Sequence, residues 1–310
     1  MRDRSIADST SASAVGIGDT ESMSDVPASK RRGVYDLVTE VANYPQWTCR
    51  PKRTILICTQ QRSGSTLLGE AMYFAGGLGC PLEYFHAGFR PGFESRWAAK
   101  TSNDFRKSLY RFRTDPTGTL SVKLFWVDVI ELLQEYGGST FDHLARAQAP
   151  FVVNDTYRQM MTILSELFPN PTFVFLTRRD QVGQAVSLSI ASQGRNWRWF
   201  AGAPKRYALR EPKYDFDGIM RIVAKIQRDN GHWNKFFDAN GIIPFRIVYE
   251  ELASDYVGIL AKAFAYLSRP DAAFPPPRLN KQADERSDAF CARFLAEFRQ
   301  KFGTSPKLAS

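Results

Sequence analysis

Short apolar runs alternate with segments of helical spacing along most of this chain, and no other feature of the sequence constrains its fold as strongly. The apolar runs have the length of strands and are bounded by turn residues. They are TILICTQ (54–60), LSVKLFW (120–126), FVVND (151–155), TFVFLTR (172–178) and FRIVYEE (245–251). Helical spacing is found at 65–76, 127–137, 157–168, 181–193, 218–241 and 256–268. Because the runs are mostly apolar along their whole length, we predict an α/β fold with a parallel sheet covered by helices on both faces.

The length of the chain is sufficient for one large domain. It has 310 residues, 44% of them hydrophobic, which is enough to bury a sizeable core. Residues 1–33 are rich in Ser, Thr, Asp and Ala and have almost no large apolar side chains, so we predict that this tail is disordered. Globular composition begins at Val34. We therefore expect a single α/β domain over 34–310.

The charge of the chain is clearly basic, with 41 Lys and Arg against 32 Asp and Glu, a net charge of +9. Such an excess suits nucleic acid, an anionic membrane surface or a polyanionic small molecule, or has no dedicated partner at all. The basic residues are spread along the sequence without a Lys/Arg-rich block. We therefore expect no nucleic-acid partner. Peripheral contact with a membrane and assembly into a homo-oligomer stay open.

The cysteines and histidines give no metal-binding pattern. The four cysteines form no CxxC pair, and three histidines are scattered, so we expect no bound metal. No 18-residue apolar stretch is present, and the first residues lack the apolar core of a secretory signal. Unpaired cysteines in a chain of this length fit a reducing compartment. We expect a cytoplasmic protein.

The segment QRSGST (61–66) follows the first predicted strand and precedes a predicted helix, which is where phosphate-binding loops occur. Gly64 permits the backbone turn that points amide groups inward. Arg62 adds a fixed charge with a planar fork suited to oxyanions. The hydroxyl donors of this loop are Ser63, Ser65 and Thr66. Either of the two serines could cap the helix. The lysine of nucleotide-triphosphate loops is absent, which argues against ATP or GTP hydrolysis.

A second candidate anion site follows the strand predicted at 172–178. Arg179 and Ser187 are eight positions apart, so that a guanidinium and a hydroxyl could converge on one phosphate near the start of a helix. Asp180 could cap that helix or orient Arg179. Two anion sites at the carboxyl ends of two strands indicate a ligand with two separate anionic groups.

These segments together resemble the trehalose 2-sulfotransferase family of bacterial carbohydrate sulfotransferases. QRSGSTLL (61–68) is similar to the 5′-phosphosulfate loop of the family, and RRDQVGQAVSL (178–188), continued by Gln193 and Trp197, is similar to its 3′-phosphate segment. Further blocks that look like the family are CPLEYF (80–85), VKLFW (122–126) and KQADERSDAF (281–290). The resemblance runs in order over roughly residues 53–300, and it implies a P-loop-like sulfotransferase domain.

The resemblance implies that the donor is 3′-phosphoadenosine-5′-phosphosulfate (PAPS), that the product is 3′-phosphoadenosine-5′-phosphate (PAP), and that no metal takes part. The 5′-phosphosulfate would be held by the loop residues Arg62, Ser63, Gly64, Ser65, Thr66 and Leu67. Arg179 and Ser187 would hold the 3′-phosphate. The segment that would close over the nucleotide consists of Lys281, Gln282 and Ala283, and Trp197 would help to bury it.

Glu83 lies in the block that resembles the family's proposed catalytic glutamate, so the resemblance makes it the general base and an acceptor-binding residue, with Arg62 as its catalytic partner. His86 is a rival base or an acceptor ligand, and Glu70 is a more remote rival. Trp97 could stack on a sugar face, and Lys123 could meet a sulfate oxygen.

The acceptor implied by the resemblance is a carbohydrate hydroxyl, on a trehalose-like disaccharide or on the sugar of a glycolipid or lipopolysaccharide. Cys80 stands where an acidic residue is expected in the trehalose-specific enzyme, so the acceptor stays open. One alternative is a kinase-like phosphoryl transferase, which would need a loop lysine and a Mg²⁺-binding acid. Another is a non-catalytic nucleotide-binding module, in which Glu83 would be replaceable.

Overall fold

The computed structural model describes residues 35–194, 197–202, 211–304 and 306. The tail expected to be disordered, 1–33, lies outside the described residues. A four-stranded sheet forms the centre, with the order β2-β1-β3-β4 and every neighbouring pair parallel. Its strands are β1 (Arg53–Thr59), β2 (Thr119–Phe125), β3 (Pro171–Thr177) and β4 (Phe245–Val248). The predicted parallel sheet is confirmed.

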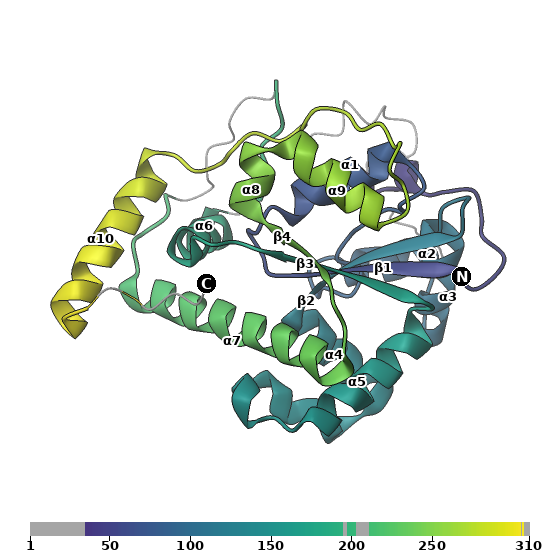
Figure 1. Ribbon diagram of the computed structural model, residues 1–310, viewed down its shortest axis with the longest axis horizontal. Helices are drawn as coiled ribbons and strands as arrows, with labels where there is room; N and C mark the ends of the chain where they lie inside the picture. The colour runs from purple at the N-terminus through teal and green to yellow at the C-terminus, as the bar shows by residue number, and fades with distance from the viewer. Residues whose placement is uncertain (1–34, 195–196, 203–210, 305, 307–310) are drawn as a thin grey trace, which may run out of the picture.

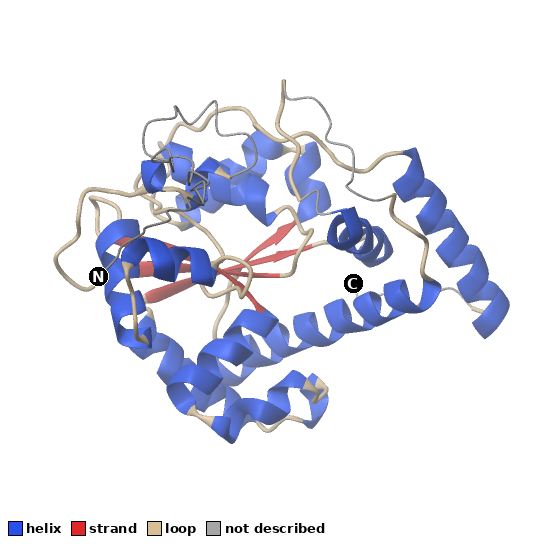
Figure 2. Ribbon diagram, turned by 180° about the vertical axis from the view of Figure 1, so that it is seen from behind, coloured by secondary structure: helices blue, strands red, loops and turns tan. Residues whose placement is uncertain are grey.

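Helices cover both faces of this sheet, also as predicted (Figures 1 and 2). They are α1 (Ser65–Ala75), α2 (Arg90–Trp97), α3 (Ser102–Arg113), α4 (Trp126–Gly137), α5 (Asn154–Leu167), α6 (Gln181–Gly194), α7 (Phe216–Asn240), α8 (Tyr249–Ser254), α9 (Tyr256–Tyr266) and α10 (Glu285–Phe302). Successive side chains of a strand point to opposite faces, which divides the core into two layers. Leu56 and Phe175 belong to the layer under α4, α5 and α7, whereas Ile57 and Leu176 belong to the layer under α1 and α9.

The strand predicted at 151–155 is wrong. Ala149–Phe151 forms a 3₁₀ turn, and α5 begins at Asn154. Pro150 lies inside this turn, where its fixed φ is favourable and its missing amide donor would weaken a sheet ladder. Phe151 and Val153 are 85% and 67% exposed and Val152 between them is buried, so the run is not buried along its length as a strand inside a covered parallel sheet would be.

The last predicted strand, 245–251, is too long at its carboxyl end. β4 stops at Val248, and α8 starts at Tyr249 with Glu250 and Glu251 in its first turn. Negative side chains are favourable at the positive end of a helix, which explains why the chain turns here. The change of element brings these two carboxylates to the carboxyl edge of the sheet.

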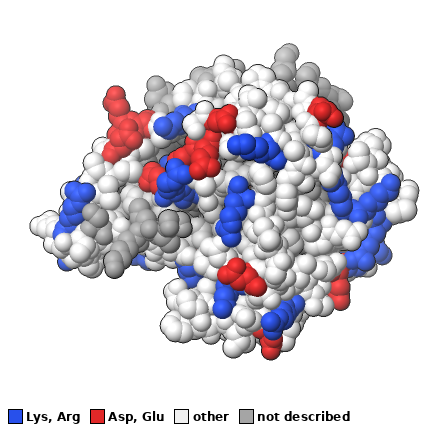
Figure 3. All heavy atoms as spheres, in the orientation of Figure 1, with Lys and Arg blue, Asp and Glu red and all other residues white. Residues whose placement is uncertain are grey.

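The carboxyl ends of all the strands lie at one edge of the sheet, because the strands are parallel. The segments that follow β1, β3 and β4 therefore meet there, as ligand-binding loops do in open α/β sheets. On the face drawn in Figure 3, Lys and Arg side chains occur in several separate places with Asp and Glu near some of them. This face therefore carries no single basic stripe.

Candidate active site

The loop between β1 and α1 has the conformation of an anion-binding turn. Arg62 and Gly64 both have positive φ, at 64° and 86°. A Cβ atom on Gly64 would lie 2.4 Å from the Tyr249 ring, so a larger residue would be strained and would also collide with that ring. The prediction that glycine is needed here therefore agrees with the geometry.

The N-terminus of α1 is not capped by a side chain. Gly64 is the N-cap residue and no side chain accepts a hydrogen bond from the first turn, so the prediction that Ser63 or Ser65 caps the helix is wrong. The Ser63 hydroxyl instead lies in the core, 2.6 Å from Thr59 Oγ1, which itself donates to the Leu176 carbonyl at 2.7 Å. Uncapped amides and the helix dipole leave a partial positive charge at this point.

Arg62 is the residue on which the separate motifs converge. Its Nε donates to Ser187 Oγ at 3.0 Å, and its Nη1 donates to the Trp197 carbonyl at 2.8 Å. Its Nη2 donates to Gln282 Oε1. Residues from the loop after β1, from α6 and from the segment before α10 are thus brought together, as the sequence resemblance implies.

No carboxylate neutralises Arg62 within the described ranges, because all of its recorded acceptors are uncharged. Burial, together with Arg178 and Arg198 nearby, lowers the pKa of Arg62 to about 10. The binding of an anion to a desolvated guanidinium that is surrounded by like charges is strongly favourable. The site is therefore electrostatically suited to a phosphate or sulfate group.

Arg179 is placed differently from the sequence expectation. Its side chain is 62% exposed and its Nη2 pairs with Glu251 Oε1 at 2.7 Å, whereas Ser187 faces Arg62. The structure therefore does not bring Arg179 and Ser187 together. Asp180 Oδ1 accepts from the Gly183 amide at 2.8 Å, so Asp180 caps α6 as one of the two expectations had it.

Arg178 is a site residue that sequence reasoning missed. Its Nη1 lies 3.5 Å from the Arg62 carbonyl, its guanidinium carbon lies 5.2 Å from the centre of the Tyr249 ring, and its side chain is only 15% exposed. Asp180 contacts Arg178 at 3.4 Å and does not orient Arg179. The paired arginines at the end of β3 were the available signal, but the pattern does not say which of two neighbours points inward.

Glu83 lies beside Lys123 at the edge of the sheet. Leu82 forms a parallel bridge with Val122, and the Lys123 amide donates to the Leu82 carbonyl at 2.9 Å, which extends the sheet by one short segment. Glu83 Oε1 and Lys123 Nζ are 2.7 Å apart, and both side chains are almost fully buried. Glu83 Oε2 has no hydrogen-bond partner, which leaves one carboxylate oxygen free to accept a proton.

Burial by itself would raise the pKa of Glu83, but the positive charges of Lys123 and Arg198 outweigh it, so the pKa is lowered. The carboxylate is therefore ionised at neutral pH, as a general base must be. Lys123 was expected to meet a sulfate oxygen; its contact here is with the carboxylate.

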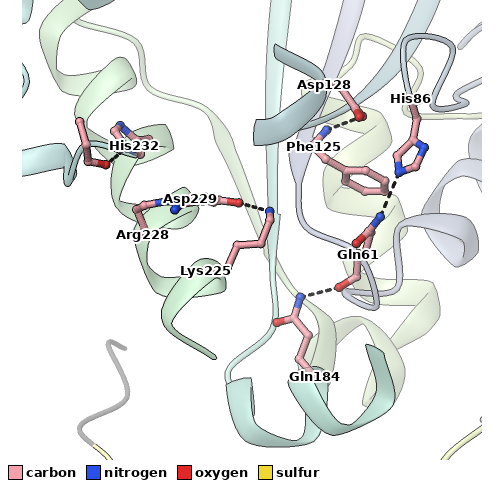
Figure 4. A network of polar contacts seen from close by, with 10 residues as sticks. Gln61, His86, Phe125, Asp128, Gln184, Lys225, Arg228, Asp229 and His232 are labelled. Atoms are coloured by element: carbon pink, nitrogen blue, oxygen red, sulfur yellow. Dashed lines mark hydrogen bonds and ion pairs between the residues drawn. The ribbon is translucent and has the colours of Figure 1, made fainter. Parts of the chain in front are cut away.

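His86 is held in a form that makes it a poor base. The Gly88 amide donates to His86 Nδ1 at 2.9 Å, so the lone pair of this ring nitrogen is already used. Nε2 lies 3.1 Å from the side-chain amide of Gln61, whose main-chain carbonyl accepts from Gln184 at 2.7 Å (Figure 4). Burial lowers the pKa of His86, against the opposing effect of Glu83, and keeps the ring neutral.

The remaining candidates lie at different distances from this centre. Glu70, the remote rival base, pairs with Arg278 at 2.8 Å and is thereby neutralised. Trp97 packs among aromatic rings of the core, 4.8 Å from Phe93 between ring centres, and its recorded contacts do not include Glu83 or Arg62. Lys281 and Ala283 are exposed, whereas Gln282 between them points to Arg62.

Two chain segments that are far apart in the sequence close one side of the site. Phe200 and Leu279 form an antiparallel bridge, the Asn280 amide donates to the Trp199 carbonyl at 2.8 Å, and the Ala201 amide donates to the Arg278 carbonyl at 2.7 Å. Arg278 also pairs with Asp36 at 2.9 Å, which ties this closure to the start of the described chain. No local sequence pattern signals these pairings.

Neither a metal-binding cluster nor a membrane-spanning helix is found in the part of the chain that the structure describes. Its His, Cys, Asp and Glu residues form no group of three or more that could hold a metal ion. None of its helices combines the length and the apolar character needed to span a bilayer.

The fold and the site together define a P-loop-like α/β protein in which Arg62, at the uncapped start of α1, is electrostatically suited to an oxyanion. Residues 54–297 match the family model described as Stf0 sulphotransferase. The chain belongs to this family, and a sulfotransferase is a transferase enzyme.

Two relatives of this chain, both from mycobacteria, have the same name. The chain is 28% identical over 273 residues to trehalose 2-sulfotransferase of Mycobacterium tuberculosis (strain ATCC 35801 / TMC 107 / Erdman), which covers 80% of this chain and 96% of that protein. It is 25% identical over 253 residues to trehalose 2-sulfotransferase of Mycolicibacterium smegmatis, covering 77% and 93%. Among solved structures, a sulfotransferase from Alicyclobacillus acidocaldarius matches with a TM-score of 0.37 and 15% identity over 84% of this chain and 98% of that one.

Proposed function

We propose that this protein transfers the sulfuryl group of PAPS to a hydroxyl of a carbohydrate, either a trehalose-like disaccharide or the sugar of a glycolipid or lipopolysaccharide. The observation that carries the proposal is Arg62, a half-buried guanidinium at the uncapped end of α1 whose acceptors among the described residues are all uncharged. The names of the mycobacterial relatives support a carbohydrate acceptor.

Each residue has a defined part in this reaction. Arg62 and the first-turn amides of α1 hold the 5′-phosphosulfate and stabilise the charge that grows on the leaving phosphate oxygen. The acceptor oxygen attacks sulfur as the bond from sulfur to the 5′-phosphate oxygen breaks, and Glu83 takes the hydroxyl proton. Ser187 and Arg179 hold the 3′-phosphate, for which Arg179 must leave Glu251. Lys281, Gln282 and Ala283 cover the nucleotide.

The function is tested with the wild-type protein. We expect PAP to raise its melting temperature and ATP with Mg²⁺ to leave it unchanged, because only a ligand that binds the folded state stabilises it. ³⁵S-labelled PAPS incubated with a panel of bacterial disaccharides, glycolipids and lipopolysaccharides should label at least one of them. Stabilisation by ATP with Mg²⁺ alone would favour the kinase-like alternative, and PAP binding without label transfer to any glycan would favour a non-catalytic module.

Removal of the Arg62 guanidinium should weaken nucleotide binding. Arg62→Met is expected to raise the Kd for PAP about 10- to 100-fold, since a hydrogen bond to a charged group contributes about 1.5–3 kcal/mol. Isothermal titration calorimetry measures this directly. Arg158→Met is the matched control, because Arg158 is 59% exposed on α5 and pairs only with Asp155. Equal losses in the two variants would contradict the assignment.

The acid limb of the pH–rate profile identifies the base. Because the pKa of Glu83 is lowered, its protonation and the resulting loss of kcat/KM should occur only below the ordinary glutamate value of 4.5. The profile should therefore be flat from about pH 5 to 7 as far as the base is concerned. His86→Asn should leave this limb in place. A limb nearer the histidine range that disappears in His86→Asn would make His86 the base.

A further inference from the structure

Arg198 is a half-buried arginine whose guanidinium packs near two aromatic rings. Its guanidinium carbon is 4.1 Å from the centre of the Tyr35 ring and 5.7 Å from the centre of the Phe89 ring. Tyr35 is the first described residue, and Phe89 lies between Glu83 and the start of α2. The rings orient the guanidinium without using its N–H groups, which leaves the donors available to a ligand.

The other enclosed arginines of the described chain have polar acceptors. Arg90 pairs with Glu94 and Glu135, and Arg113 donates to main-chain carbonyls of the N-terminal turns. The Nε atoms of Arg113, Arg178 and Arg198 are all buried without an acceptor, but only Arg198 also forms no recorded side-chain ion pair or hydrogen bond with any described residue. A buried donor without an acceptor costs about 1–3 kcal/mol, so this arginine is expected to gain its acceptor from a ligand.

Arg198 lies near both Arg62 and Glu83, because its charge acts on both groups and its neighbour Trp197 contacts Arg62. The neighbouring Trp197 carbonyl accepts from Arg62 Nη1 at 2.8 Å, which fixes this segment against the anion loop. The charge of Arg198 is also near enough to Glu83 and Lys123 to lower the pKa of both groups. A guanidinium placed near both Arg62 and Glu83 is close to the point where the sulfur atom must lie during transfer.

We propose that Arg198 binds the non-bridging oxygens of the sulfuryl group, an inference that rests on the proposed function. During transfer the acceptor oxygen forms its bond to sulfur, the bond from sulfur to the 5′-phosphate oxygen breaks, PAP leaves with that oxygen, and Glu83 takes the hydroxyl proton. Arg198 holds the three remaining sulfur-bound oxygens throughout, so it contacts the group that moves. Arg62 instead contacts the phosphate that stays with the nucleotide.

The experiment compares two ligands that differ only in the sulfuryl group. Kd values for PAPS and for PAP are measured by calorimetry without acceptor for the wild type, Arg198→Met, Arg198→Lys and the control Arg158→Met. Methionine keeps apolar contact with the Tyr35 and Phe89 rings, and lysine keeps the charge, so at least one variant should retain the fold. Thermal melting of each variant checks this.

We expect Arg198→Met to raise the Kd for PAPS about 10-fold or more, while the Kd for PAP changes less than about threefold. Arg198→Lys should lie between Arg198→Met and the wild type. An unchanged PAPS-to-PAP ratio, or equal weakening of both ligands, would overturn the role of Arg198 and leave it a packing or nucleotide-binding residue. Failure of the wild type to bind PAP would instead overturn the proposed function. The wild type therefore tests the proposed function, and the Arg198 variants test the role of Arg198.

Discussion

Glu83→Gln is expected to reduce turnover about 10²- to 10⁴-fold, the usual effect of removing a general base, while the Kd for PAP stays close to the wild-type value. The amide cannot accept the hydroxyl proton, but it can fill the same space beside Lys123. Turnover is measured as transfer of ³⁵S from PAPS to the acceptor found in the glycan panel. Near-normal turnover in this variant would exclude Glu83 as the base.

The buried partner of Glu83 requires a control for this prediction. Lys123 Nζ lies 2.7 Å from the Glu83 carboxylate, so Glu83→Gln leaves a lysine without its counter-charge. Burial already lowers the pKa of Lys123, and without the opposing effect of Glu83 the amine can release its proton. The double variant Glu83→Gln/Lys123→Met removes the uncompensated charge. If it is as stable as the wild type but still inactive, the loss of turnover comes from the missing base.

Lys123→Met is expected to lower the free energy of unfolding by about 3–5 kcal/mol, because it leaves the Glu83 carboxylate buried and unpaired. Both side chains are almost inaccessible to solvent, at 0% and 5%, so solvent does not compensate for the lost partner. Chemical denaturation measures the change. The double variant with Glu83→Gln should recover most of the loss, and a double variant less stable than Lys123→Met would show that the two residues are not energetically coupled.

The fold could be predicted from the sequence where the apolar pattern is local. Runs such as 54–60 and 172–178 became β1 and β3 because their side chains fill both core layers. The run 151–155 likewise begins with apolar residues but follows Pro150, and only its tertiary context shows that Phe151 stays exposed. Composition identified a strand-like run, but it does not show whether that run pairs with a strand of the sheet.

The part of the site that depends on local backbone structure could be predicted from the sequence. Gly64 and the start of α1 directly after the loop follow from the position of that loop between a strand and a helix, whereas the missing side-chain cap of α1 did not. The partner of Ser187 was not predictable, because Arg62 reaches it across 125 positions of sequence. Arg178, Arg198 and the pairing of Lys123 with Glu83 depend likewise on side-chain direction and on long-range packing, which no local pattern specifies.

The bridge between Leu82 and Val122 makes the position of the Glu83 carboxylate independent of the chain segment that would contact the acceptor. Glu83 is attached to the sheet itself, immediately before the segment from 86 to 118 that begins with His86 and ends where β2 starts. Phe93, Phe105 and Leu109 anchor that segment in the core, so its exposed positions can change in composition while the carboxylate keeps its register with Lys123. Under the proposed function, acceptor preference could therefore diversify between relatives at the exposed positions of one contiguous piece of chain, without rebuilding the reactive centre.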